Sequence, residues 1–442
     1  MKLPILITCL ALNSLSISAN TISQQQVTKD VSILADDNMA GRASFTAGSK
    51  KAANYIAQRF KQIGLSPLAG LNDFKQSFQL FQIEVEKTEI NLNGTKVPSE
   101  NSLLFTRYEE LNWSTKTALR TVKIGAEDNF RSALAEVNQL KENVVVLIDS
   151  SHTEIFSRYH QHFNRPQNKF EINQGPSALL LLTNDTNVEN ITLTASSKVQ
   201  KRSLTNVVGV LPGKKKADEI VLFSAHYDHL GDHSNQQNKT NEKQSIDLIY
   251  NGADDNASGT SAVINLAEYY RNNNNNQRSL VFVAFAAEEL GGFGSKYFSE
   301  KLNPDKITAM LNIEMVGKPS KFGAGELWMT GAERSNLQSI LNKNLQNNKQ
   351  IFTDPYPKQR LFYRSDNATL ARLGVPAHSF SSTQIDKDQH YHKVSDDLSS
   401  LDLSSMTKVI QSLAEASQTL VDGTDTPSRI DQKKVKSSGS FF

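Results

Sequence analysis

Imidazole and carboxylate side chains follow several apolar runs of the sequence, each at the point where the run ends. The apolar run 220–225 leads directly into residues 226–229, which read His-Tyr-Asp-His. Two later runs, ending at residues 287 and 313, are followed by Glu288-Glu289 and by Glu314. Imidazole nitrogens and carboxylate oxygens are typical ligands of divalent metals such as zinc. If these runs are neighbouring strands, their polar ends form a candidate metal site.

Two further segments add residues of the same types. The loop 251–259 reads Asn-Gly-Ala-Asp-Asp-Asn-Ala-Ser-Gly and precedes a predicted helix, and residues 388–392 read Asp-Gln-His-Tyr-His. Each has a simpler interpretation, since aspartates can cap a helix and a single histidine is often an ordinary core residue. Together they favour a metal, because several buried charges are costly without a compensating cation.

The elements that must position these residues alternate between strands and helices. This alternation predicts an α/β fold with a mixed, mostly parallel central sheet flanked by helices, in which ligands lie at the carboxyl ends of the strands. The expected helices are 24–36, 47–63, 258–271, 332–346, 366–373 and 402–421, and the expected strands of the sheet are 206–211, 219–226, 280–286, 307–315 and 377–382.

The pattern of apolar and polar residues changes between residues 86 and 200. Short β-like runs such as 144–148 and 178–182 alternate with polar stretches, and no His, Asp and Glu cluster is present there. We predict an inserted β-rich accessory domain at 86–200. Residues 20–85 and 201–423 then form the main domain, and the polar, basic tail 424–442 is expected to be disordered.

Composition and the N-terminus limit the class of protein. The 442 residues include 48 Lys and Arg against 46 Asp and Glu, a net charge of +2, so a strongly basic nucleic-acid binder is excluded. Residues 1–19 read as a secretory signal peptide, too short in its apolar part to span a bilayer. The one cysteine, Cys9, lies within it. We expect an exported protein, periplasmic or extracellular, with no stable membrane insertion; the oligomeric state stays open.

Five segments in order resemble peptidase family M28. They are 224–231, 251–259, 285–291, 311–317 and 391–392, and the segment 39–42 (Met-Ala-Gly-Arg) is similar to the N-terminal part of bacterial members. The resemblance covers roughly 25–85 and 205–422, and 86–200 stands where many members carry an inserted domain, often of the protease-associated type. It implies the zinc-aminopeptidase, phosphorylase/hydrolase-like α/β fold.

The resemblance also implies a role for each matching residue. Two Zn²⁺ ions, or other divalent metals, are expected per chain. The implied assignments are His226 and Glu314 for one ion, Glu289 and His392 for the other, Asp255 as the bridge with a cis peptide to Asn256, Asp228 as the acceptor from the His226 ring, and Glu288 as the general base.

The chain departs from the family pattern in two places. Glu314 stands where most members have Asp, and Asn367 follows Ser365-Asp366 where a histidine is frequent. The first departure keeps a carboxylate, and the second bears on the substrate. We expect the remaining histidines nearby, at 229, 233 and 390, to be structural or surface residues.

The resemblance implies an exported aminopeptidase that acts on peptides. A carboxypeptidase or dipeptidase on the same metal centre is the alternative, because Arg360 and Arg364 lie in a candidate substrate loop and could hold a C-terminal carboxylate. A glutaminyl cyclase of related fold is a further alternative. It needs only one metal ion, whereas this chain has an apparently complete set of ligands for two. A receptor-like homologue without catalysis should have lost several ligands, whereas all five positions keep metal-competent residues.

Overall fold

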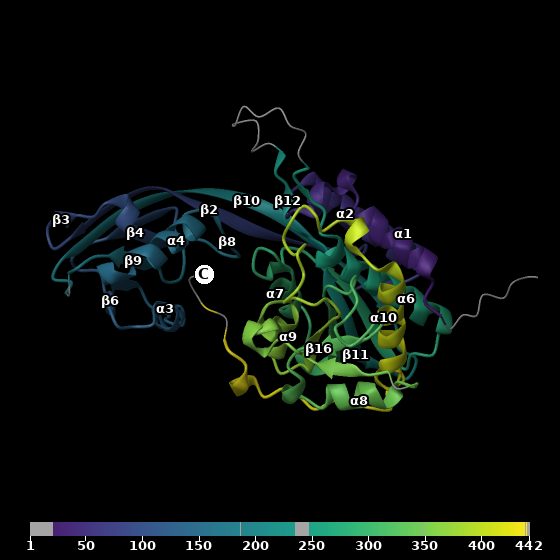
Figure 1. Ribbon diagram of the computed structural model, residues 1–442. Coiled ribbons are helices and arrows are strands. Elements are labelled where there is room, and N and C mark those ends of the chain that lie inside the picture. Colours follow the sequence, from purple (N-terminus) through teal and green to yellow (C-terminus); the bar gives the residue numbers. More distant parts are fainter. Residues whose placement is uncertain (1–20, 186, 235–246, 348, 438, 440–442) are drawn as a thin grey trace, which may run out of the picture.

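The computed structural model describes residues 21–185, 187–234, 247–347, 349–437 and 439. A mixed sheet of 12 strands forms its centre (Figure 1). Its main path runs β17 (Ile351–Thr353), β16 (Leu327–Met329), β18 (Ala377–Ser381), β15 (Ile307–Ile313), β11 (Lys216–His226), β14 (Arg278–Phe285), β10 (Ile191–Leu211), β2 (Lys75–Leu92) and β3 (Thr95–Lys96). The short strands β1 (Ser66–Pro67) and β5 (Glu110–Trp113) pair with β10, and β8 (Gln167–Lys169) pairs with β2.

The strands that carry the candidate site are parallel neighbours. Strand β11 pairs in parallel with β14 on one side and with β15 on the other, and β15 pairs in parallel with β18. Strands β10 and β16 join antiparallel. The predicted mixed α/β sheet is confirmed, but its parallel part is limited to β14, β11, β15 and β18 and to the pair β16 and β17, because the strands β2 and β10 pair antiparallel. The carboxyl ends of β11, β14 and β15 meet at one edge.

Helices cover both faces of this sheet. Side chains of α1 (Gln24–Leu34), α2 (Ala47–Ile63), α6 (Gly259–Asn273), α8 (Leu337–Asn344), α10 (Leu403–Ala416) and α11 (Gln418–Val421) belong to the core on one face, whereas α7 (Phe293–Ser299) and α9 (Asn367–Ala371) pack on the other. Strand β14 shows why both faces fill. All eight of its residues are buried, with Phe282 in the first core and Val283 in the second, as expected for a strand covered on both sides.

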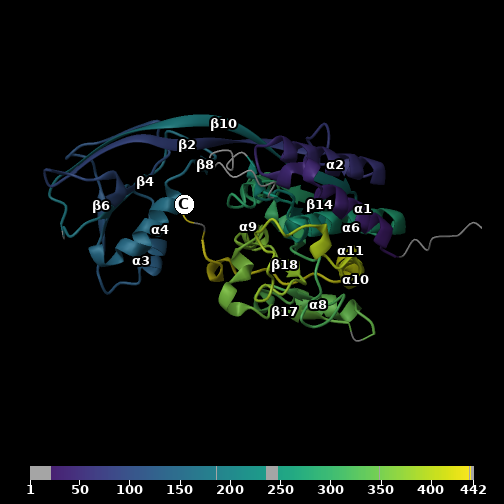
Figure 2. The same ribbon diagram turned by 45° about the horizontal axis from the view of Figure 1, so that its top comes forward.

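Strands β2 and β10 form a long antiparallel ribbon that leaves the central sheet (Figure 2). Its far half carries a second sheet of four strands, in the order β4 (Ser102–Phe105), β9 (Ala178–Leu182), β7 (Val144–Ile148) and β6 (Arg120–Ile124), with α3 (Phe130–Val137) and α4 (Thr153–Phe163). We call residues 86–200 the accessory part. Both predicted limits fall inside ribbon strands, because β2 and β10 run without a break from the main domain into the accessory part.

The tail differs from the prediction of disorder. Ile430 and Val435 are buried in the core on the α7 and α9 face, and the Arg278 guanidinium donates to the Thr426 hydroxyl at 2.6 Å. The few apolar residues among the tail's lysines are sufficient to fix residues 424–437 on the main domain. The prediction of disorder was based on the average composition of the tail, in which these few apolar residues do not stand out.

The predicted signal peptide, residues 1–19, lies outside the described residues. In the described ranges, no helix has both the length and the apolar character needed to cross a bilayer.

Candidate metal centre

Two groups of metal-competent side chains lie at the carboxyl edge of β11, β14 and β15. The first consists of His226, Asp255 and Glu314, and the second of His229, Asp255 and Glu289; within each group the candidate ligand atoms lie within 4.8 Å of one another. Asp255 belongs to both.

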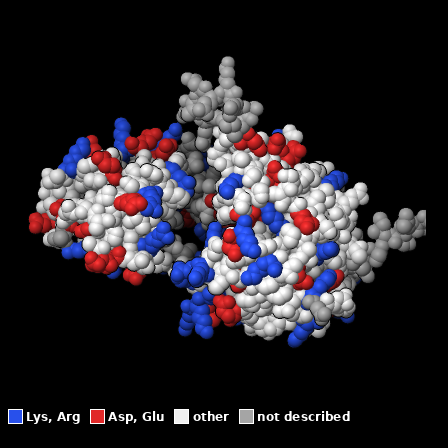
Figure 3. Space-filling model, viewed as in Figure 1, with Lys and Arg blue, Asp and Glu red and all other residues white. Residues whose placement is uncertain are grey.

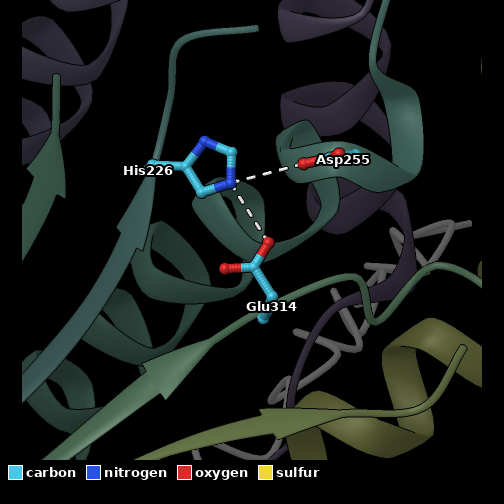
Figure 4. Close-up of side chains that lie close together, drawn as sticks. All are labelled: His226, Asp255 and Glu314. Carbon is cyan, nitrogen blue, oxygen red and sulfur yellow. Dashed lines mark hydrogen bonds and ion pairs between the residues drawn. The ribbon is translucent and has the colours of Figure 1, made fainter. Parts of the chain in front are cut away.

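The first group is centred on the last residue of β11 (Figure 4). Nε2 of His226 lies 3.1 Å from Oε1 of Glu314 and 3.3 Å from Oδ1 of Asp255. Glu314 follows β15, and the Ser365 hydroxyl donates to its other carboxylate oxygen at 2.6 Å. The His226 side chain is 2% exposed, so solvent does not reach this group from the side of His226.

His392, which is not a member of the second group as defined above, lies against the other oxygen of Asp255 and beside Glu289. Nε2 of His392 lies 3.2 Å from Oδ2 of Asp255 and 3.6 Å from Oε1 of Glu289. The His392 side chain is 37% exposed, so this side of the site faces solvent. The five residues predicted as metal ligands therefore converge, and Asp255 presents one oxygen to each of two histidines.

His229 lies deeper in the second group than the sequence analysis expected. Its side chain is fully buried, and Nδ1 lies 2.9 Å from Oε1 of Glu289 and 3.9 Å from Oδ2 of Asp255. Its Nε2 has no hydrogen-bond partner. The expectation of a structural or surface role omitted this contact, although the separation of three residues from His226 could have signalled it. His233 and His390 instead contact backbone carbonyls of Leu230 and Ser395.

The loop before α6 gives Asp255 its position through backbone geometry. Gly252 has φ +54°, and a Cβ there would lie 2.2 Å from the Asp255 carbonyl oxygen, so only glycine fits. The peptide bond from Asp255 to Asn256 is cis, as the resemblance implies. The Asn256 amide then donates to the carbonyl of Ile313 at 2.9 Å, which ties this loop to the end of β15.

The contact expected between Asp228 and the His226 ring is different in the structure. Nδ1 of His226 donates to the backbone carbonyl of Asp228 at 3.0 Å, while the Asp228 carboxylate lies 3.8 Å away. That carboxylate instead accepts from the backbone N–H of Glu288 and from the Ser44 hydroxyl, both at 3.1 Å. Because a carbonyl only accepts, Nδ1 carries a proton, and Nε2 is the ring nitrogen of His226 that faces Asp255 and Glu314.

Electrostatic effects in the group are strong. Burial alone would raise the pKa of Asp255, but hydrogen bonds from His226 and His392 hold it well below its usual value. Burial opposes protonation of His226, yet Glu314 and Asp255 raise its pKa well above the usual value. For Glu288, burial raises the pKa well above the usual value, while the charge of His226 acts in the opposite direction.

Two cations, the fully buried Arg42 and the partly buried Lys318, hold the loops of the site in place. The Arg42 guanidinium donates to four backbone carbonyls, which belong to Leu34, Tyr227, Asn251 and Gly252. This contact shows what the segment 39–42 does in the fold.

Nζ of Lys318 lies 2.9 Å from Asp388, 3.5 Å from Asp254 and 3.7 Å from Asp396. The Asp396 carboxylate accepts in turn from the backbone N–H groups of Asp254 and Asp255. Lys318 therefore joins the loops that carry Glu314, Asp255 and His392.

The donor set fits zinc. Three carboxylates and two histidines converge, and in the described part of the chain no lysine or arginine forms an ion pair with Asp255, Glu289 or Glu314. Their negative charge needs a cation, and nitrogen and oxygen ligands of this kind are those that zinc takes.

The α/β fold of this chain is similar to that of solved aminopeptidases. The aminopeptidase from Aneurinibacillus sp. strain AM-1 aligns with a TM-score of 0.53 at 17% identity, over 95% of this chain and 97% of that one. The zinc aminopeptidase BSAP from Bacillus subtilis aligns with a TM-score of 0.54 at 16% identity, over 94% of this chain and all of that one. At these identities the likeness shows the fold. Residues 206–417 match the model of peptidase family M28, and this part of the chain belongs to that family.

Curated relatives match over shorter lengths. "Aminopeptidase YwaD" of Bacillus subtilis (strain 168) is 29% identical over 116 residues, which are 25% of this chain and 22% of that protein. A "probable leucine aminopeptidase" of Trichophyton verrucosum is 28% identical over 218 residues, 46% of this chain and 52% of that protein. The chain thus matches only about a fifth to a half of the length of these relatives.

Proposed function

We propose that this protein is a zinc-dependent aminopeptidase with two metal ions. His226 and Glu314 would hold one ion, Glu289 and His392 the other, and Asp255 would bridge them. The observation that carries the proposal is the orientation of Asp255, whose two oxygens lie 3.3 Å and 3.2 Å from Nε2 of His226 and of His392 respectively. When bound, two zinc ions activate a water and polarise the scissile carbonyl.

Glu288 is the general base of this proposal. It follows β14 directly before Glu289, and its backbone N–H is fixed by the Asp228 carboxylate at 3.1 Å. It belongs to neither donor group, so its carboxylate is available to accept a proton from the attacking water and to deliver it to the leaving amine nitrogen. Burial raises its pKa, which is the direction expected of a group that holds a proton before delivering it.

The pocket beside the metal-competent residues favours an apolar N-terminal side chain. Besides the site residues, its wall includes Met315, Trp328, Leu361, Ile385 and Tyr391. Burying a leucine-sized side chain against such a wall contributes about 1.5–3 kcal/mol to binding. The names of the relatives as aminopeptidases, one of them a probable leucine aminopeptidase, support the same activity.

A carboxypeptidase or dipeptidase remains the second candidate, and one observation favours it. Arg364 lines the same pocket, where its Nη2 donates to the Tyr391 hydroxyl at 3.1 Å. Its charge could hold a C-terminal carboxylate. The Arg360 side chain is not among the residues that line this pocket.

Peptides with free and with acetylated N-termini distinguish these activities. We expect the purified protein to release single N-terminal residues from the free peptides only, and to lose this activity with a chelator and regain it with zinc, as read by mass spectrometry. Trimming from the C-terminus, or equal cleavage of acetylated peptides, would transfer the assignment to the second candidate. Absence of any cleavage, with two zinc ions bound, would refute both.

The second group requires its own test, because His229 and His392 both face Glu289. We assign His392 as the ligand and His229 as a positioning residue that holds Glu289 at 2.9 Å. In this assignment His392→Ala binds one zinc ion per chain, whereas His229→Ala still binds two, the second more weakly. Metal analysis after dialysis against a zinc buffer measures the stoichiometry. Retention of two ions in His392→Ala and loss of one in His229→Ala would reverse the assignment.

Export also belongs to the proposal and rests on the pattern of residues 1–19. The intact mass of protein recovered from the periplasm or the medium tests it, and cleavage near Ala19 is expected. Recovery of uncleaved protein from the cytoplasm would contradict it.

A further inference from the structure

A second cleft adjoins the candidate metal centre and the apolar pocket. It has a volume of about 350 Å³ and is lined by Glu288 and Glu289 at one end and by Lys296, Arg364 and Arg372 on its walls. The cations come from α7, from the loop before α9 and from the end of α9. We call this the cationic cleft. Because it shares Glu288, Glu289 and Arg364 with the apolar pocket, the two meet at the site of the proposed reaction.

The cations of this cleft have no acidic partner in the described part of the chain. None of the ion pairs there includes Lys296, Arg364 or Arg372. Arg364 donates to the Tyr391 hydroxyl, and Nε of Arg372 donates to the carbonyl of Lys436 at 2.9 Å. Three positive charges therefore line one cavity without a direct ion pair, although the carboxylates of Glu288 and Glu289 lie at its end. An anion that enters would find charged donors already in place.

Burial makes this arrangement unfavourable for the protein alone. Burial lowers the pKa of Lys296, and the charge of Arg372 lowers it further, while the buried Asp366 acts in the opposite direction. Burial also lowers the pKa of Arg372. Desolvated like charges are typical of a site whose counter-ion is a ligand, since the ligand's charge offsets the cost.

The positive lining continues toward the accessory part. A neighbouring cleft of about 580 Å³ shares Glu289, Gly291 and Lys296 with the cationic cleft and adds Arg165 and Arg202. Figure 3 shows Lys and Arg side chains along the hollow between the accessory part and the main domain. The cationic surface therefore continues from the cationic cleft into this neighbouring cleft.

We propose that the cationic cleft binds a carboxylate carried by the part of the substrate that leaves. This inference rests on the proposed aminopeptidase activity. With the N-terminal side chain in the apolar pocket, the chain beyond the scissile bond runs into the cationic cleft. The carboxylate is either the free C-terminus of a di- or tripeptide or the side chain of an acidic residue. The substrates are accordingly short peptides with a free C-terminus or peptides with an acidic residue after the first.

Four matched peptides test this proposal and separate the two sources of the carboxylate. The pair Leu-Ala and Leu-Ala-amide differ in the free C-terminus, and the pair Leu-Glu-amide and Leu-Gln-amide differ in the side chain. Charged hydrogen bonds of this kind predict kcat/KM higher on the order of tenfold for the carboxylate member of at least one pair. The preference should decline as salt is increased, because salt screens partly exposed charges. The pair that shows the preference identifies the source.

Variants connect the preference to the cleft. In Lys296→Gln and Arg372→Gln we expect the ratio of kcat/KM within the responding pair to fall toward one, mainly through KM, and Lys296→Arg should restore it. Because the ratio is taken within one variant, a general loss of folded enzyme cancels. The matched control is Lys301→Gln, an exposed lysine close to α7 that lines none of these cavities; its ratio should equal that of the parent.

Two results would overturn the inference. One is equal kcat/KM for both members of both pairs in the parent enzyme. The other is a preference that persists unchanged when Lys296 and Arg372 are both replaced by Gln. Failure of the proposed function looks different, since leucine would then be released from none of the four peptides in the presence of zinc.

Discussion

Replacing Arg42 by methionine removes the group that links the N-terminal segment to the candidate metal centre. The Arg42 side chain is fully buried, and its Nε donates to the Tyr227 carbonyl at 2.7 Å. Nη1 donates to Leu34 and to Asn251, both at 2.5 Å, and Nη2 donates to Gly252 at 2.9 Å. Tyr227 follows the candidate ligand His226, and Gly252 begins the loop that carries Asp255.

The magnitude follows from these contacts. A hydrogen bond from a charged donor contributes about 1.5–3 kcal/mol, and a buried acceptor left without a donor costs about 1–3 kcal/mol. The cost of burying the guanidinium, visible in the lowering of the Arg42 pKa to about 10, offsets part of this. Methionine replaces the aliphatic part of the arginine side chain but donates no hydrogen bond. We therefore expect Arg42→Met to lower the free energy of unfolding by about 3–5 kcal/mol, as when one partner of a buried charged group is removed.

Urea unfolding in the presence of a chelator measures this change, and zinc titration of the folded variant measures the effect on the metal. The matched control is Arg59→Met on α2, whose guanidinium pairs with Asp30 and Glu268 far from the ligands along the chain. We expect both variants to be less stable, but only Arg42→Met to bind zinc more weakly. Equal zinc affinity in the two variants, or a loss of stability under about 1 kcal/mol in Arg42→Met, would refute this account of Arg42.

Three further predictions concern other groups. Glu288→Gln should still bind zinc and lower kcat by on the order of 10²–10⁴, because only the proton carrier is lost; an unchanged kcat with metal bound would contradict its role. Lys318→Met leaves three buried carboxylates without their cation and should lower stability by about 3–5 kcal/mol and weaken zinc binding, while Lys318→Arg retains more of both. Burial lowers the pKa of His378 from 6.5 to about 4. The unfolded chain therefore binds a proton that the folded chain refuses, and between pH 7 and pH 4 the stability should fall by about 3 kcal/mol more in the parent than in His378→Asn, as measured by urea unfolding at each pH.

The sequence predicted the sheet and the convergence of its polar ends because these depend on local patterns. The apolar run that became β14 is buried on both faces, and its end had to place Glu288 and Glu289 at the edge where β11 ends in His226. In parallel neighbours the register brings such ends together. This part of the site could therefore be inferred without coordinates.

What the sequence could not supply depends on which atom faces which. The expected partner of the His226 ring was the Asp228 carboxylate, but the carbonyl of the same residue takes that place. The choice depends on backbone dihedrals after β11, and no residue type encodes them. The contact of His229 with Glu289 was not predicted either, because it joins segments that are sixty residues apart in the sequence.

The contacts behind the ligands suggest how the site is held before any metal binds. Arg42 donates to the carbonyl of Tyr227, next to His226, and to that of Gly252, in the loop that carries Asp255. The Asp396 carboxylate accepts from the N–H groups of Asp254 and Asp255, and Asn256 links the same loop to β15. All of these contacts involve backbone groups, so they fix the path of the chain rather than the candidate donor atoms. A change at Arg42 or Asp396 should therefore weaken metal binding more than it lowers kcat of the loaded enzyme, whereas a change at Glu288 should do the reverse.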